Sequence, residues 1–281
     1  MRWFYCAVVL LALTPSAYAD DLDILRGTDS VGVATFPRWS GFYFGVQGNY
    51  SDAQSNFSNA TQPLVAFSLR DLTLEAVDAP SSYQVLGSGT SHSYGFGGFV
   101  GYNTQWQDLI LSLEANYTHA PFNNTAPQMP IGRVVTAGSN EYSVDVSGTG
   151  SMHVTDYGAL RARAGWIFNN FLPYGFVGFA LGWGNYAVTT LASGQENALT
   201  APSPVIPCNP LVTATCVDYS FSNSNAKNGV LLYGFSVGGG VDVALSPNIF
   251  LRAEYEHIQF APVASITTTI NSARIGGGLK F

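Results

Sequence analysis

The strongest constraint on this chain is a period of two in its apolar residues, which recurs in eight separate stretches. In the last ten residues, for example, Ala273, Ile275 and Leu279 alternate with Arg274 and Lys280. Successive side chains of a β-strand point to opposite faces, whereas the apolar residues of a helix recur every three or four positions. The predicted strands lie within residues 39–51, 92–106, 109–119, 154–168, 172–190, 229–245, 249–260 and 272–281.

The composition narrows the class of fold that such strands can build. Charged residues make up only 10% of the chain, against roughly 25% in ordinary soluble domains. Beyond the N-terminal segment there is no apolar run of the roughly 18 residues that a spanning helix needs. A closed sheet with lipid outside and polar groups inside combines these properties. The sequence therefore predicts an all-β fold, an eight-stranded antiparallel up-and-down transmembrane β-barrel.

Short and long connections alternate between the predicted strands. The tight turns 107–108, 169–170 and 246–248 lie at one end of the strands, and the long connections 52–90, 121–150 and 191–228 lie at the other end together with a shorter crossing near 261–265. Outer-membrane barrels place short turns in the periplasm and long loops outside the cell. The long segments are rich in Ser, Asn, Thr and Pro, so we expect irregular extracellular loops that contact surface ligands.

The polar face of the strands carries charges of both signs. Its charged residues are Glu114, Arg161, Arg163, Asp242, Arg252, Glu254, Glu256, Arg274 and Lys280. Antiparallel pairing around the turn at 246–248 places Asp242 directly opposite Arg252. An eight-stranded barrel is only wide enough to be filled by side chains. We therefore predict a plugged, ion-paired interior, with a water-filled conduit as the alternative.

The N-terminal segment has the pattern of an export signal. One cation, Arg2, precedes an apolar stretch, and Ala17-Tyr18-Ala19 forms an A-x-A cleavage site. We predict a signal peptide over residues 1–19, a periplasmic lead-in over 20–38 and the barrel over 39–281. The alternative for the first segment is a buried helix. The net charge of −7 gives no electrostatic attraction to nucleic acid.

Two further residue classes give local predictions. Cys208 and Cys216 are an even pair in an exported chain, which favours a disulfide over a metal site because no His lies near them. Aromatic residues near the strand ends predict two interfacial girdles. The girdle at the turn end comprises Trp39, Trp106, Trp166, Phe168 and Phe281, and the one at the loop end comprises Tyr50, Tyr94, Tyr117 and Tyr186.

Both ends of the predicted barrel resemble a known family. The segment Arg38–Ser51, "RWSGFYFGVQGNYS", resembles the opening of the small outer-membrane β-barrel proteins of α-proteobacteria, although Asn49 replaces a usual glycine. The segment 23–27, "DILRG", is also similar to its members. That family includes surface antigens and hemin-binding or "porin-family" proteins. The terminal strand ending in Phe281 resembles the signal read by the barrel-assembly machinery. The resemblance implies an outer-membrane location and contact with its lipid.

The sequence leaves several functions open. We favour a non-enzymatic structural and surface-interaction role, without a cofactor. Hemin binding is an alternative for which His153 is the candidate ligand, because the strand period points it inward while His92, His119 and His257 point outward. A narrow diffusion channel is another. An enzyme acting on membrane lipid would need a nucleophile beside a base. The pairs His92-Ser93 and Glu256-His257 are its candidates, but adjacent strand residues point to opposite faces.

Overall fold

A computed structural model describes residues 38–198 and 216–281. These residues belong to one compact unit that covers 36–281. The predicted signal peptide, most of the lead-in and the Cys208–Cys216 disulfide lie outside the described residues. In the described part, no helix has the length and hydropathy of a membrane span.

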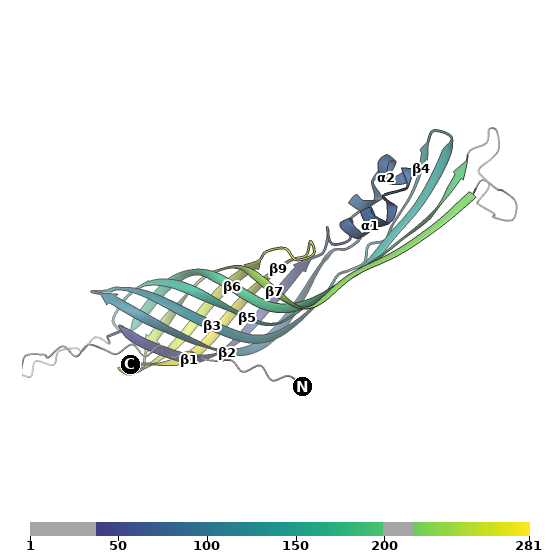
Figure 1. Ribbon diagram of the computed structural model, residues 1–281. Helices are drawn as coiled ribbons and strands as arrows, with labels where there is room; N and C mark the ends of the chain where they lie inside the picture. The colour runs from purple at the N-terminus through teal and green to yellow at the C-terminus, as the bar shows by residue number, and fades with distance from the viewer. Residues whose placement is uncertain (1–37, 199–215) are drawn as a thin grey trace, which may run out of the picture. The chain divides into compact units, whose positions relative to one another are not determined.

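Eight strands close into a ring in which every neighbour is antiparallel (Figure 1). They are β1 (Gly41–Asn56), β2 (Ser88–Trp106), β3 (Leu109–Thr125), β5 (Asn140–Trp166), β6 (Phe171–Ala198), β7 (Cys216–Ala244), β8 (Ile249–Phe260) and β9 (Thr267–Lys280). Each strand pairs with the next one in this series, and β9 pairs with β1 to close the ring. The eight-stranded antiparallel barrel predicted from the period of two is confirmed.

The predicted tight turns join these strands at one end of the barrel. Gln107 and Asn169 adopt positive φ values of 54° and 53° in two of them. The third turn, between β7 and β8, is closed by hydrogen bonds from the Leu245 and Ser246 amides to the Ile249 carbonyl. Glutamine and asparagine at turn positions therefore reverse the chain within a few residues.

The described parts of the long connections at the other end form helices and strands, where the sequence predicts irregular loops. The first holds helices α1 (Gln62–Leu69) and α2 (Thr73–Asp78) and the 3-10 turn η1 (Pro80–Ser82). The second holds β4 (Ile131–Ala137), which pairs with β5. Beyond the barrel, β5, β6 and β7 continue with β4 as one sheet. We call β4 and residues 140–153, 185–198 and 216–229 the extension.

The extension is ordered because it has an apolar core, which is continuous with buried residues of the barrel such as Phe260. Val65 and Leu69 of α1 and Leu74 of α2 are buried in one cluster with Val144 of β5 and Val188 of β6. Asn223 Nδ2 of β7 donates a hydrogen bond to Ser68 Oγ of α1 at 2.6 Å. The helices thus cover one face of the sheet. The side chains on that face are apolar, so the alternation of apolar and polar residues continues along the strands past the end of the barrel.

A second, aromatic cluster closes the turn end of the barrel from inside. Trp39, Tyr43, Phe99 and Phe250 are buried there, and the rings of Trp39 and Phe250 lie 6.1 Å apart. The prediction that Trp39 belongs to the outer girdle is therefore wrong, because this ring fills the lumen. Tyr186, expected at the other girdle, is likewise buried, in the core of the extension.

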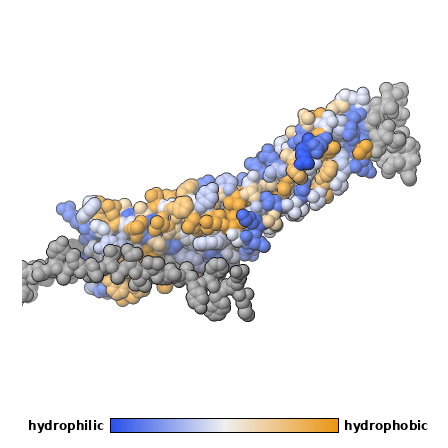
Figure 2. Space-filling view, viewed as in Figure 1, coloured by the Kyte–Doolittle hydropathy of each residue, from blue (hydrophilic) through white to orange (hydrophobic). Residues whose placement is uncertain are grey.

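The outer wall of the barrel is apolar over the height of a membrane. Figure 2 shows hydrophobic residues gathered over the barrel strands. Along the eleven residues from Phe42 to Asp52, β1 presents its apolar side chains outward, and this length rises about 25 Å when a strand is tilted by about 40°. Phe281 is 71% exposed at the turn end and stacks on Phe44 at 5.8 Å.

Candidate functional site

The barrel interior holds a balanced cluster of four arginines and four acids. The strand period directs all of them inward, and each is at most 5% exposed. The members of this ionic cluster are Glu114, Arg161, Arg163, Asp242, Arg252, Glu254, Glu256 and Arg274. They lie on β3, β5, β7, β8 and β9, so the cluster bridges opposite walls of the barrel.

Glu114 is the centre of one half of the ionic cluster. Its Oε2 accepts hydrogen bonds from Arg163 Nη1 at 2.6 Å, from Arg252 Nη1 at 2.7 Å and from the Tyr43 hydroxyl at 2.7 Å. Its Oε1 accepts from Arg161 Nη2. One carboxylate from β3 therefore binds arginines of β5 and β8 and fixes them across the lumen.

Asp242 joins two of these arginines from the opposite side. It lies opposite Arg252 in the register of β7 and β8. Arg252 Nε donates to Asp242 Oδ1 at 2.8 Å, and Arg163 Nη2 donates to Asp242 Oδ2 at 2.8 Å. The pairing expected from the turn at 246–248 is thus part of a larger network.

Glu254 and Glu256 hold the other half of the ionic cluster. Arg161 Nη1 lies 2.6 Å from Glu254 Oε1 and 3.3 Å from Glu256 Oε1. Arg274 lies 3.6 Å from Glu254 and also contacts Glu256 Oε2. The Tyr174 hydroxyl donates to Glu254 Oε2 at 3.0 Å. Both carboxylates are therefore shared between arginines.

Aromatic rings cover the remaining faces of the guanidinium groups. Arg163 lies 3.7 Å from the ring centroid of Tyr174, and Arg252 lies 4.0 Å from that of Phe99. Arginine stacks favourably on such rings when water is excluded. Removing one partner from a buried ion pair leaves an uncompensated charge and costs about 3–5 kcal/mol. The ionic cluster is therefore a rigid unit.

Lys280 does not join the ionic cluster. Its ammonium contacts the carbonyl oxygen of Arg38 and lies 4.6 Å from the ring centroid of Trp39. It lies opposite Tyr43, on the inward face of β9 near its last residue. No carboxylate of the described ranges lies within ion-pairing distance of it. The strand period predicts correctly that Lys280 faces inward. The prediction that it joins the interior ion pairs is wrong, because it lies at the turn end of the barrel beside Trp39.

A hydroxyl layer and the apolar core of the extension lie beyond the ionic cluster. The Tyr157 hydroxyl lies 3.3 Å from Ser51 Oγ and 3.1 Å from Ser272 Oγ, and Ser51 Oγ donates to Ser272 Oγ at 2.8 Å. Next to them, Phe122 and Phe260 are buried. Aromatic, ionic, hydroxyl and apolar layers thus follow one another along the lumen.

The prediction that His153 points inward is wrong. A β-bulge between Val154 and Asp156 shifts the register of β5 against β6. Met152 and Val154 are therefore buried on one side of the bulge, and Tyr157 on the other. His153 faces outward, where its Nδ1 contacts Asn123 Oδ1. A single inserted residue reverses the face of every position beyond it.

The other candidate residues for hemin binding or catalysis are also separated. His92 stacks on Tyr50, while the Ser93 hydroxyl donates to the Tyr94 carbonyl. Glu256 lies in the ionic cluster, while His257 contacts Asn271 on the outer wall. Within residues 38–198 and 216–281, no three His, Cys, Asp or Glu side chains are grouped to hold a metal ion.

These features define a class: a transmembrane β-barrel of eight strands with a side-chain-filled lumen and an ordered sheet at one mouth. The chain belongs to the family described as outer membrane protein beta-barrel domain, whose model matches residues 30–281. It is an outer-membrane protein. Since short turns of such barrels face the periplasm, the extension lies outside the cell.

The chain is also similar to other known proteins. The chain is 24% identical over 202 residues to a 22 kDa outer membrane protein of Rhizobium leguminosarum bv. viciae, covering 68% of each chain. Among solved structures it is similar to the attachment invasion locus protein Ail of Yersinia pestis, with 13% identity and a TM-score of 0.32, over 86% of this chain and 99% of that one. Neisserial surface protein A gives 16% identity and a TM-score of 0.32, over 86% and 98%.

Proposed function

We propose that this protein is a non-conducting membrane anchor that presents the extension for contacts at the cell surface. One observation carries this proposal: β5 and β7, which contribute Arg161, Arg163 and Asp242 to the filled lumen, continue outside the membrane with β6 as a packed sheet. The barrel supplies rigidity, and the extension supplies the contact surface.

The ionic cluster supports a closed lumen. An ion moving along the axis would have to separate Arg252 from Asp242 and Glu114, which hold it through three hydrogen bonds of 2.7–3.0 Å. Trp39 and Phe250 would have to move as well. An eight-stranded barrel has no further space for an ion beside such side chains.

The extension supports the contact role. Within the described residues, β7 pairs with β8 only from Gly234 onward, so residues 217–229 form a sheet edge that has β6 on one side only. Such an edge presents backbone groups that can pair with a strand of another protein. Val217 on this edge and Val134 on β4 are 61% and 65% exposed. Apolar side chains exposed outside the membrane favour protein contacts.

The experiment measures conductance and adhesion with the same set of variants. One variant replaces residues 190–223 by Asn-Gly, which joins the register partners Thr189 and Ser224 through a hairpin turn. A second, Val217→Lys, places a charge on the edge, and Thr149→Lys is its control on an inner strand.

We expect every variant to insert and none to conduct in planar bilayers. Cells that display the wild type or Thr149→Lys should bind protein-coated surfaces, and cells that display the other two variants should lose most of this binding. Steady conductance of the wild type would refute the closed lumen. Full adhesion by the variant that lacks residues 190–223 would refute the role of the β6 and β7 strands of the extension.

A further inference from the structure

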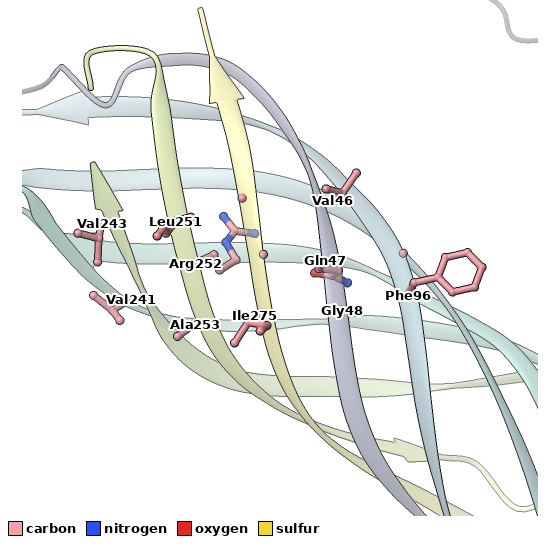
Figure 3. A pocket seen from close by; sticks show the side chains of 13 residues that line it. Val46, Gln47, Gly48, Phe96, Val241, Val243, Leu251, Arg252, Ala253 and Ile275 are labelled. Atoms are coloured by element: carbon pink, nitrogen blue, oxygen red, sulfur yellow. The ribbon is translucent and has the colours of Figure 1, made fainter. Parts of the chain in front are cut away.

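Small residues hollow the lipid-facing wall formed by β2, β1, β9 and β8. Gly48, Gly277, Ala253 and Ala273 all face outward there, in neighbouring rows of the sheet. Gly48, Gly277 and Ala253 line a groove of about 820 Å³, and Ala273 lines a second hollow of about 740 Å³ that shares Gly48 and Ala253 with the first. Figure 3 shows the first groove, which is lined by Val46, Phe96, Val241, Leu251, Ala253 and Ile275.

Of the glycines that line this groove, the two outward-facing ones, Gly48 and Gly277, are not required by packing. A Cβ added to Gly48 would meet no atom nearer than 4.0 Å, and one added to Gly277 none nearer than 3.6 Å. Larger side chains would therefore fit at both positions. Val46 and Ile275 are each 72% exposed because their neighbours have no side chain. The hollow itself, rather than backbone strain, distinguishes this part of the wall.

A row of polar side chains lies at the extracellular end of the same four strands. It consists of His92, Asp52, Asn271 and His257, which are register partners across β2, β1, β9 and β8. Asn271 Nδ2 donates to Asp52 Oδ2 at 3.2 Å, and Asn271 Oδ1 lies 2.7 Å from His257 Nδ1. Because Asp52 fixes the amide orientation, His257 Nδ1 carries the proton. We call these four residues the polar row.

The polar row has the charge that suits an amine. Asp52 is its one carboxylate, the row contains no Lys or Arg, and in the described part of the chain Asp52 Oδ1 has no hydrogen-bond partner. A half-buried carboxylate at a membrane interface attracts an ammonium group and repels a lone phosphate. The histidines on either side of Asp52 offer imidazole groups to a phosphate next to that ammonium.

We propose that this wall binds one zwitterionic lipid with a primary-amine headgroup. Its acyl chain lies in the groove between Val46 and Ile275, and its ammonium binds Asp52. The groove lies at hydrocarbon depth and the polar row lies at the membrane surface, directly along the same strands. A lipid is therefore the occupant whose apolar and charged parts match both, and this site is independent of the surface role of the extension.

Lipid retention tests the site. The wild type is extracted from vesicles that contain equal amounts of phosphatidylethanolamine, phosphatidylcholine and phosphatidylglycerol, and bound lipids are identified by native mass spectrometry. Gly48→Leu/Gly277→Leu fills the groove, and Asp52→Asn removes the charge. The control is Gly175→Leu/Ala115→Leu, which enlarges two lipid-facing residues on other strands, where a Cβ at Gly175 meets nothing nearer than 3.8 Å.

We expect one phosphatidylethanolamine on the wild type and on the control. The groove variant should retain about tenfold less, equivalent to about 1.4 kcal/mol, because its leucine side chains occupy the space of the acyl chain. Asp52→Asn should retain the three lipids equally, because it offers no charge to the ammonium group. Equal lipid retention by the groove variant and the wild type would overturn the proposal. Preferential retention of phosphatidylglycerol by the wild type would also overturn it. A wild-type dimer that is lost in the groove variant would overturn it as well, because a second copy of the chain would then cover the wall.

Discussion

Arg252 binds Asp242 through two parallel hydrogen bonds, from Nε to Oδ1 at 2.8 Å and from Nη2 to Oδ2 at 3.0 Å. Both residues are almost completely buried, and Arg163 binds the same carboxylate. This bidentate pair joins β7 to β8 next to the turn at 246–248. The pairing of these two residues can be predicted by counting residues from the turn, and it is also part of the ionic cluster that fills the barrel.

Neutralising Asp242 should therefore destabilise the barrel strongly. Asp242→Asn leaves Arg163 and Arg252 with an unbalanced positive charge, so we expect the free energy of unfolding to fall by about 3–5 kcal/mol. Urea unfolding in lipid vesicles, followed by tryptophan fluorescence, measures this change. Asp71→Asn is the matched control, because the Asp71 side chain is 86% exposed and should give less than about 1 kcal/mol. Equal effects of the two substitutions would contradict a structural role for the ionic cluster.

Tyr43→Phe should cost less than the loss of a charge. The Tyr43 hydroxyl donates to Glu114 and accepts from Arg163 Nη1, both at 2.7 Å. Its removal leaves two charged groups with one hydrogen bond fewer each, which corresponds to about 1–3 kcal/mol. Tyr102→Phe, on the lipid-facing wall, should leave the urea midpoint unchanged. If Tyr43→Phe leaves the free energy of unfolding unchanged, the ionic cluster rearranges to compensate for the missing hydroxyl.

Two glycines on neighbouring strands should respond oppositely to a methyl group. A Cβ at Gly97 would collide with the carbonyl oxygen of Tyr117, whereas one at Gly48 has no atom within 4.0 Å. Gly97→Ala should therefore lower the yield of folded, heat-resistant barrel on gels, because β2 and β3 cannot approach to hydrogen-bonding distance. Gly48→Ala should fold like the wild type. Normal folding of Gly97→Ala would mean that the two strands separate there without loss of pairing.

The extension should lose stability in strong base through Tyr219. Burial, followed by the charges of Asp145 and Glu196, raises the pKa of Tyr219 to about 12. Its hydroxyl donates to the Ser143 carbonyl at 2.6 Å, which requires the neutral phenol. Because the folded pKa lies above the usual value near 10, this contribution to stability is complete below about pH 10 and is lost as the pH rises through about 12.

A difference titration isolates this group. The phenolate absorbance of the wild type minus that of Tyr219→Phe should show one tyrosine that titrates near pH 12. Proteolysis of the extension should increase over the same range in the wild type alone. Titration of the difference signal near pH 10 would place Tyr219 in contact with solvent.

Much of the barrel can be predicted from the sequence, because the direction of each side chain and the position of each turn depend on residues that are neighbours in the chain. The period of two assigns Glu114, Arg161 and Arg252 to the inside, and turn-forming residues such as Asn169 mark the strand ends. Helix α1 and the β4–β5 hairpin also have local sequence signals. Pro63 at a helix start precedes apolar residues at helical spacing, and Gly138-Ser139 lies between two alternating stretches.

The sequence by itself determined which face of each barrel strand is apolar, and therefore that the charges pair inside a closed sheet in a membrane. Only the tertiary structure decided where that period breaks. The β-bulge between Val154 and Asp156 places the His153 side chain on the outer face. Helices α1 and α2 pack on β5 and β6 beyond the membrane and bury the apolar face of the sheet there. The hollow at Gly48 and the link from Asp52 to His257 likewise arise between strands that are far apart in the chain. Alternation is a property of neighbours in sequence, whereas bulges, grooves and hydrogen-bonded rows depend on which strands lie side by side.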